Sequence, residues 1–231
     1  MQLLHKFDEG FEVYFTSSDD GDARELVESG DISRVLTDIC GRPVELLRLN
    51  QIHSDIVYES GEVLSLGQAG IPEGDAIVSK SPNVSLGVFV ADCAPVALVS
   101  NEGVFAAAHC GWKGLRAGIL ENTVNAMVEG GATNISAFVG PCIKSDCYEF
   151  DGPNLNEFKA LLGQEVVATT AWGTPSLDMV AAIEKTLRSC DVERVSSSAD
   201  CTGCDAGYFS YRLRRSSQRH LMAVVPAGVM T

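Results

Sequence analysis

Continuous apolar runs, separated by short polar turns, dominate the middle of the chain. They cover residues 76–78, 85–90, 96–99 and 104–108, and most of their positions are hydrophobic instead of alternating with polar ones. Runs of this kind are typical of strands that are buried on both faces. Shorter β-like runs predict further strands at residues 11–16, 44–49, 135–139, 208–211 and 221–225.

Helical spacing of apolar and charged residues occurs elsewhere. A polar loop followed by a helix is expected over residues 21–39, and a tight glycine turn at 111–114 precedes a helix at 115–129. Amphipathic helices are expected at 154–162 and 178–189. Strands outnumber helices and come in runs, which favours an α+β fold with mixed sheets over a doubly wound α/β fold.

Composition bounds the class of protein. The 231 residues, 45% of them hydrophobic, are enough for one large domain or two small ones with a real core. Seventeen basic against thirty-one acidic residues give a net charge of −14. This charge argues against nonspecific binding to nucleic acid or to an anionic membrane, but it leaves room for a small anionic ligand.

Nothing in the chain predicts export or membrane insertion. The start carries charges where a signal peptide would have its apolar region. The longest apolar stretch, residues 84–99, is interrupted by Asp92 and Pro95 and is too short to cross a bilayer. A cytoplasmic protein is the expectation, and the sequence identifies no protein partner.

Three polar side chains in these apolar surroundings are candidate metal ligands. His53, Cys93 and His109 each fall near the predicted end of a strand, and the two histidines are half of the four in the chain. Taken singly, each reads as a satisfied core residue, since free cysteine is commonly buried. Taken together they match a zinc site with a fourth position open for water or substrate, because their long spacing differs from that of zinc fingers.

Asp92, next to Cys93, has two interpretations. It can orient a ligand imidazole or act as a general base, or it can cap a strand end by accepting backbone N–H groups. Lys113, in the glycine turn, suggests an anion site at a helix start. Arg212 and Arg219 belong to the basic cluster near the C-terminus, which is either a solvated face or an arm that binds an anionic substrate.

The eight cysteines do not predict a disulfide framework. In a chain of this length without an export signal, reduced thiols are expected. Cys201 and Cys204 form one CxxC pair, which alone is weak evidence for either zinc or redox chemistry.

Several motifs, read in order, resemble the YfiH-like family, long labelled laccase-domain or polyphenol oxidase. They are residues 51–53 (QIH), 91–96 (ADCAPV), 107–114 (AAHCGWKG), 140–143 (GPCI), 201–202 (CT) and 209–212 (FSYR). The resemblance implies a single domain over residues 1–231, with packed mixed β-sheets flanked by helices. It also implies a zinc-dependent purine nucleoside phosphorylase, with adenosine deaminase and methylthioadenosine phosphorylase activities assigned to the family as well.

The resemblance assigns roles to individual residues. It implies one zinc ion held by His53, Cys93 and His109, with Asp92 and Cys93 in the catalytic centre. It implies that a purine nucleoside and phosphate bind at Gln51, Lys113, Arg212 and Arg219.

The chain departs from the family pattern at three places. The usual threonine–arginine motif near the N-terminus is replaced by residues 15–21 (FTSSDDG), so an arginine is missing there. Lys113 stands where an arginine is usual, which keeps the charge but loses the two-pronged guanidinium. Gln218 replaces a glycine, while Arg219 is retained.

Three other functions use the same residues differently. In a cysteine hydrolase or deamidase, Cys93 would be the nucleophile and His109 or His53 the base. A metal-bound scaffold without catalysis would explain the missing arginine. Copper-based phenol oxidation is rejected, because four histidines cannot bind several copper ions.

Overall fold

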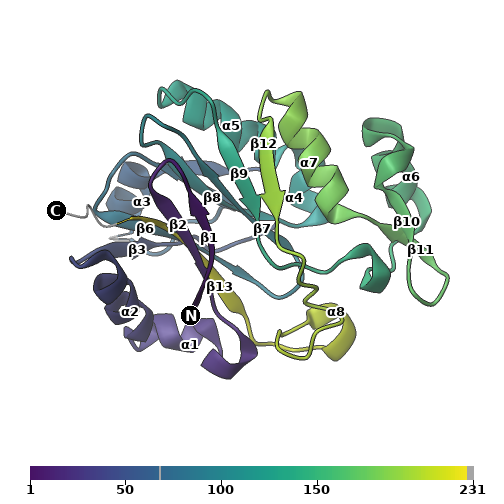
Figure 1. The fold of residues 1–231 in the computed structure, drawn as a ribbon, viewed down its shortest axis with the longest axis horizontal. Coiled ribbons are helices and arrows are strands. Elements are labelled where there is room, and N and C mark those ends of the chain that lie inside the picture. Colours follow the sequence, from purple (N-terminus) through teal and green to yellow (C-terminus); the bar gives the residue numbers. More distant parts are fainter. Residues whose placement is uncertain (68, 228–231) are drawn as a thin grey trace.

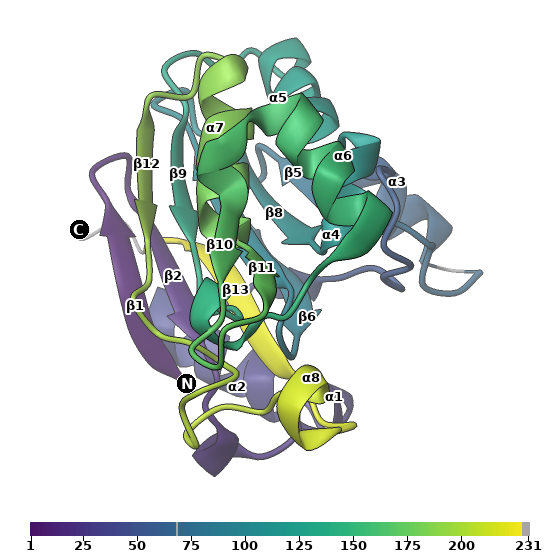
Figure 2. The ribbon, with the colours of Figure 1, turned by 90° about the vertical axis from the view of Figure 1, so that its right-hand side faces the viewer.

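Two mixed β-sheets pack face to face, with helices covering both outer faces (Figures 1 and 2). The structure is a computed structural model that describes residues 1–67 and 69–227. The strands are β1 (Gln2–Phe7), β2 (Phe11–Phe15), β3 (Glu45–Leu47), β4 (Val57–Glu59), β5 (Ala76–Ser79), β6 (Val84–Val90), β7 (Ala94–Val99), β8 (Phe105–Cys110), β9 (Ser136–Val139), β10 (Val167–Thr169), β11 (Pro175–Leu177), β12 (Arg194–Ser197) and β13 (His220–Pro226). The helices are α1 (Ala23–Glu28), α2 (Asp31–Cys40), α3 (Ser60–Leu66), α4 (Trp112–Ala117), α5 (Ile119–Glu129), α6 (Gly152–Leu162), α7 (Met179–Ser189) and α8 (Tyr211–Arg214).

Both large sheets combine parallel and antiparallel neighbours, as expected. The first has the order β1-β2-β13-β6-β3, and only its β3–β6 pair is parallel. The second has the order β12-β9-β7-β8-β5-β4, with parallel pairs at each edge. A short β10–β11 hairpin lies apart from both. The α+β prediction is therefore confirmed.

The continuous apolar runs are explained by burial on both faces of a strand. In β8, Phe105 and Ala107 point into the core between the two sheets, while Ala106 and Ala108 face the helical layer of α4–α7. In β13, Met222 and Val224 enter the core between the sheets. The alternate side chains of β13 pack against α1 and α2. Because every position of such strands is buried, polar alternation is absent from the sequence.

Three predicted elements differ in the structure. The expected strand at 208–211 is wrong, because Ser210 caps the short helix α8 by accepting the N–H group of Leu213 at 3.2 Å. The expected helix at 115–129 already begins at Trp112 and is broken at Gly118, whose φ of 103° is unfavourable for other residues. The expected helix within 21–39 is two helices, which meet at Gly30 with φ of 78°.

The expectation of reduced thiols is wrong at one pair of cysteines. A disulfide joins Cys147 to Cys204, while the other six cysteines are free. The two segments bring these side chains together only in the folded chain, since they are 57 residues apart in sequence.

Within the part of the chain that the structure describes, no helix is both long and apolar enough to cross a membrane.

Candidate metal centre and substrate cleft

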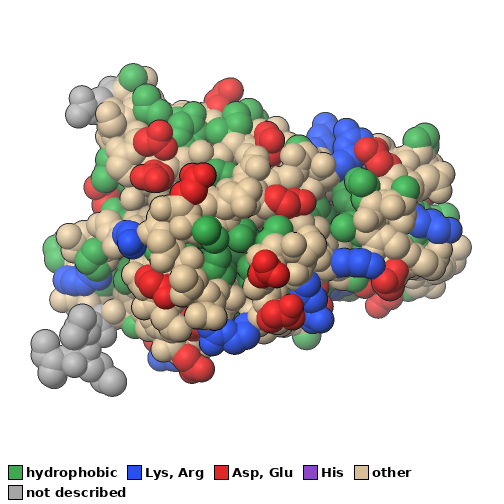
Figure 3. All heavy atoms as spheres, turned by 90° about the horizontal axis from the view of Figure 1, so that it is seen from above, with side chains coloured by type: hydrophobic (Ala, Val, Ile, Leu, Met, Phe, Trp, Pro, Cys, Tyr) green, Lys and Arg blue, Asp and Glu red, His purple; other side chains and the backbone are tan. Residues whose placement is uncertain are grey.

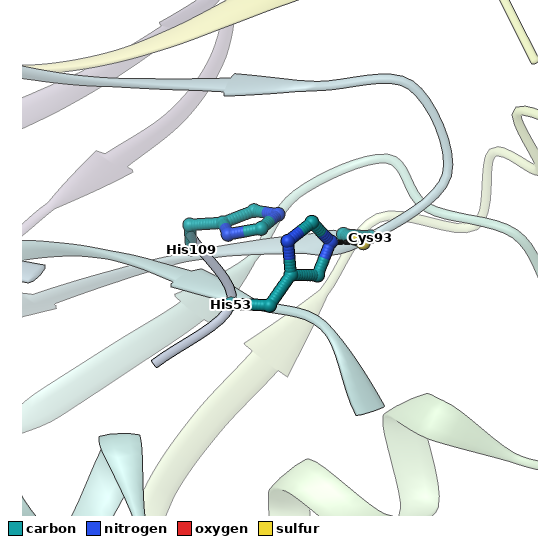
Figure 4. Close-up of side chains that lie close together, drawn as sticks. All are labelled: His53, Cys93 and His109. Atoms are coloured by element: carbon teal, nitrogen blue, oxygen red, sulfur yellow. Dashed lines mark hydrogen bonds between the residues drawn. The ribbon is translucent and has the colours of Figure 1, made fainter. Parts of the chain in front are cut away.

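The three predicted ligands converge, with their donor atoms all within 4.8 Å of one another (Figure 4). His53 lies in the loop between β3 and β4, Cys93 lies in the turn between β6 and β7, and His109 lies in β8. His53 is exposed, Cys93 is partly exposed and His109 is buried. The group therefore has a solvent-facing side, although His53 does not lie at a strand end as expected.

A buried carboxylate, Asp75, organises the loop that carries His53. It accepts the backbone N–H groups of Ile52, His53 and Ser54 at 3.3, 3.1 and 2.6 Å. The Ser54 hydroxyl adds a fourth hydrogen bond at 2.7 Å. These donors converge because His53 adopts a φ of 62°, a left-handed conformation that is uncommon for a residue other than glycine. Asp75 is completely buried, so these hydrogen bonds compensate for its lost hydration.

The same carboxylate orients His109. Asp75 Oδ1 lies 2.7 Å from His109 Nδ1, so a proton on Nδ1 leaves Nε2 available to a metal. Histidine ligands of metals commonly have such a carboxylate behind them. Asp75 thus controls both histidines of the group, and sequence reasoning missed it. Its position just before the apolar strand β5 is the one signal that could have indicated a special role.

The charges of the group suit metal binding. Burial by itself raises the pKa of Cys93, but the adjacent His109 and His53 outweigh it and lower that pKa. Burial lowers the pKa of His109, whereas Cys93 and Asp75 raise it, and the net direction is upward. Burial also opposes ionisation of Asp75, yet the hydrogen bonds from His109 and Ser54 lower its pKa to about 2. A thiolate at Cys93 is therefore stabilised, and thiolate is the form that binds metals.

The donor spacing fits zinc. Cys93 Sγ and His53 Nε2 are 3.7 Å apart. Tetrahedral zinc, with bonds of about 2.3 Å to sulfur and about 2.0 Å to nitrogen, holds such a pair about 3.5 Å apart. A Cys/His donor set suits zinc, and copper also accepts it.

Glycines in the 111–114 turn make room for the ligands. A Cβ atom at Gly111 would lie 2.8 Å from His53 Cδ2 and 3.1 Å from Cys93 Sγ. At Gly114 it would lie 2.9 Å from the backbone oxygen of Ser54. This turn is the start of α4, and its glycines let the helix approach the loop that carries His53.

The metal group lies in the wall of a cleft of about 780 Å³, a volume that suits a small molecule. All the predicted substrate residues line this cleft, namely Gln51, Lys113, Arg212 and Arg219, and so does Asp92. The aromatic residues Phe89, Trp112, Tyr148 and Tyr211 also line the cleft. Flat aromatic surfaces can hold a planar heterocycle.

Gln51 and Asp92 are already engaged by the protein. The Gln51 side chain forms two hydrogen bonds of 2.7 Å with the backbone N–H and C=O of Phe89. Asp92 accepts the hydroxyls of Thr202 and Ser210 at 3.0 and 2.8 Å, and the N–H group of Arg212 at 2.7 Å. Burial raises the pKa of Asp92, in spite of these donors. Asp92 therefore holds the segment 202–212 by hydrogen bonds, next to Cys93 of the His/Cys/His group.

Two arginines that sequence reasoning missed also line the cleft. Arg48 lies with its guanidinium carbon 5.6 Å from the centre of the Phe89 ring. Arg24, at the start of α1, forms an ion pair of 2.7 Å with Asp22. Together with Arg212 and Arg219 they bring four arginines to the lining of the cleft, although no arginine occurs within residues 15–21.

The remaining two histidines lie in aromatic clusters. His5 stacks on Phe138, and His220 stacks between Phe15 and Phe209. The thiol and imidazole groups at the cleft therefore comprise a single His/Cys/His set among the described residues.

Sequence comparison identifies relatives over most of the chain. The model of the family described as multi-copper polyphenol oxidoreductase laccase matches residues 9–226. A purine nucleoside phosphorylase of Streptomyces coelicolor is 36% identical over 181 residues, which are 77% of this chain and 73% of that protein. A purine nucleoside phosphorylase of Clostridium acetobutylicum is 33% identical over 215 residues, which are 89% of this chain and 87% of that protein.

Solved structures share the fold. The DUF152 protein NMB0706 of Neisseria meningitidis has a TM-score of 0.80 at 25% identity, covering 98% of this chain and 99% of that one. YlmD of Geobacillus stearothermophilus has a TM-score of 0.79 at 23% identity, covering 95% and 92% of the two chains. The resemblance drawn from the motifs is therefore confirmed, and the chain belongs to the laccase-like YfiH family.

Proposed function

We propose that this chain is a cytoplasmic, zinc-dependent purine nucleoside phosphorylase that works as a single domain. One observation carries the proposal: a His/Cys/His group opens into the same cleft as four arginines and four aromatic residues. Relatives that are 33–36% identical are named purine nucleoside phosphorylase, which agrees with this chemistry. The residues proposed to act are His53, Cys93 and His109 at the metal, Asp92 beside it, and Gln51, Lys113, Arg24, Arg48, Arg212 and Arg219 around the substrates.

The reaction joins phosphate to C1′ of the nucleoside as the glycosidic bond to the purine breaks. Bound zinc supplies Lewis-acid polarisation at the edge of the cleft. Arg48, Arg212 and Arg219 bind the phosphate dianion and hold it for attack, since guanidinium groups pair well with phosphate. The rings of Phe89, Trp112 and Tyr148 provide the surface against which the purine lies. Asp92 positions Arg212 through the backbone hydrogen bond described above.

A substrate screen tests the proposal. Adenosine, inosine, guanosine and methylthioadenosine are each incubated with zinc-loaded protein, with and without phosphate. Phosphate-dependent release of free base and the sugar 1-phosphate is expected. Ammonia released without phosphate would show deamination in its place. No turnover of any of the four would contradict the proposal and support a metal-bound scaffold.

Arg48→Ala is predicted to weaken phosphate binding without disturbing the metal. Loss of one charged hydrogen-bond donor should raise KM for phosphate on the order of tenfold, with zinc content unchanged. Arg34→Ala removes the same charge at an exposed position on α2 that does not line the cleft, and it serves as the control. Steady-state kinetics at varied phosphate measure the effect, and an equal change in both variants would refute this role for Arg48.

A cysteine hydrolase is the second candidate, because Cys93 is stabilised as a thiolate beside two imidazoles. Metal content separates the two functions. In the zinc enzyme, His53→Ala loses the metal and the phosphorolysis together. If His53→Ala retains hydrolytic activity after all metal has been removed, Cys93 as a thiol nucleophile would be favoured.

A further inference from the structure

A second cluster of cysteines lies at the start of the segment 202–212. The sulfur atoms of Cys147, Cys201 and Cys204 are all within 4.8 Å of one another. Cys147 is buried, Cys201 is partly exposed and Cys204 is exposed. Two of the three form the disulfide, and Cys201 stays free beside it.

The backbone around Cys201 is arranged for a charged sulfur. The N–H groups of Lys144 and Cys204 point at Cys201 Sγ, at 3.3 and 3.4 Å. The second of these bonds closes the turn from the first to the last cysteine of the CxxC pair. Such N–H groups complement the negative charge that a metal-bound thiolate carries.

Close approach of the third cysteine requires a glycine. A Cβ atom at Gly203 would lie 2.9 Å from Cys147 Cβ and 3.1 Å from Ile143 Cγ1. Glycine at this position therefore lets Cys147 reach the CxxC turn. The Arg214 guanidinium holds the same turn by donating to the backbone oxygens of Gly203 and Thr202, each at 2.7 Å.

We propose that Cys147, Cys201 and Cys204 form a second metal site, which binds a thiophilic divalent cation such as Zn²⁺ when the disulfide is reduced. Reduction by a dithiol breaks the Cys147–Cys204 bond, and the dithiol becomes a disulfide as it gives up two electrons and two protons. The three cysteine thiols then release their protons to solvent and bind the cation, whose oxidation state does not change.

The backbone spacing accommodates either state. The Cα atoms of Cys147 and Cys204 are 6.4 Å apart, at the wide end of the range of about 4.4–6.8 Å found for disulfides. Zinc–sulfur bonds of about 2.3 Å at tetrahedral angles require the sulfurs to be about 3.8 Å apart. Side-chain rotation at the exposed Cys204 supplies this change, and the same exposure admits water as the fourth ligand.

The cluster connects two parts of the substrate cleft. Cys147 precedes Tyr148, which lines the cleft. Thr202, inside the CxxC pair, donates its hydroxyl to Asp92. Either the disulfide or the bound metal would therefore link Tyr148, in the wall of the cleft, to the segment 202–212, which Asp92 holds by hydrogen bonds.

Metal stoichiometry tests the site. The wild-type chain is reduced with a phosphine, which is oxidised to its phosphine oxide with an oxygen atom from water. The reductant is then removed, and the protein is saturated with Zn²⁺. About two zinc ions per chain are expected after reduction and about one when the disulfide is intact. His53→Ala should bind about one after reduction, and Cys204→Ser should bind about one with or without reduction. Cys190→Ser, which changes a cysteine outside the cluster, should behave as wild type.

Cobalt spectra provide a second readout that needs no variant in the cluster. Reduced His53→Ala loaded with Co²⁺ should show a sulfur-to-cobalt absorption band that disappears on reoxidation. A reduced wild-type chain that binds only one zinc ion would overturn the proposal. So would a second zinc ion that persists in Cys204→Ser.

Discussion

Asp75 fixes the geometry of the candidate metal group, because it contacts both the His53 loop and His109. Its two oxygens fix the His53 loop through three backbone N–H groups and fix His109 through Nδ1. The amide of an asparagine could not accept all of these hydrogen bonds equally well, because it has one acceptor oxygen and one donor NH₂ group where the carboxylate has two acceptor oxygens. The two histidines of the candidate metal group are therefore held by a carboxylate that is not itself a member of the group.

Asp75→Asn is predicted to lower zinc affinity about 10- to 100-fold, as is typical when the hydrogen-bond partner of a metal-bound histidine is changed. Competition with a zinc chelator measures the affinity. Asp38→Asn is the control, since Asp38 is an exposed carboxylate on α2. Unchanged zinc affinity in Asp75→Asn would show that the histidines keep their positions without the carboxylate.

At the scale of elements, the cleft depends on a close contact between α4 and the His53 loop. Helix α4 carries Gly111 as its N-cap and Gly114 within its first turn, and neither has a positive φ. Glycine is needed at these two positions because α4 lies so close to the His53 loop, and not because the backbone conformation requires it. The sequence predicts an anion-binding turn here, and the structure adds a packing role for its glycines.

Gly114→Ala is predicted to destabilise the protein by about 1–3 kcal/mol, because the new methyl group meets the rigid backbone oxygen of Ser54. Alanine in a helix ordinarily stabilises by about 0.5–1 kcal/mol relative to glycine. Gly61→Ala, in α3 with nothing within 4 Å of the added carbon, should show this ordinary gain. Urea unfolding of both variants gives the two free energies, and a gain in Gly114→Ala would refute the steric argument.

At the scale of the molecule, a strongly acidic protein contains a locally basic cleft. Acidic and basic side chains are interspersed over the face shown in Figure 3, and the net charge is −14. The cleft instead gathers arginines from α1, α8 and the segments before β4 and β13. Attraction of the phosphate in the proposed reaction would follow from this local placement and not from the overall charge.

Acid stability of the whole molecule is predicted to depend on His220, at the start of the central strand β13. Burial lowers the pKa of His220 to about 4, and its Nε2 accepts the N–H group of Phe209 at 2.6 Å. The unfolded chain takes up a proton near pH 6.5, well before the folded chain does. The contribution of neutral His220 to the free energy of unfolding is therefore fully present above about pH 6.5, and it is lost as the pH falls toward 4.

His220→Gln keeps an acceptor for Phe209 and removes the titration. Urea unfolding at about pH 7.5 and about pH 5 should show that wild type loses about 2 kcal/mol more than this variant between the two conditions. Equal losses would mean that His220 does not titrate differently in the folded and unfolded chains.

The sequence alone predicted the buried strands and the three residues, His53, Cys93 and His109, that the fold brings together as a candidate metal group. Apolar runs report burial directly, and a polar residue such as Cys93 or His109 within them stands out because its burial requires a partner. The order of the motifs was enough to identify the family. Local patterns failed at residues 208–211, where β-like side chains form a capped turn and a short helix.

Only the tertiary structure decided which residues complete the site. Asp75, Arg24 and Arg48 have ordinary sequence surroundings, and their roles arise from groups that the fold brings to them from distant segments. The pairing of Cys147 with Cys204 depends in the same way on two loops that meet only after folding. The burial of a strand can be predicted from the apolar composition of its own segment. Contacts between residues of distant segments depend on how the whole chain folds, so no local sequence pattern predicts them.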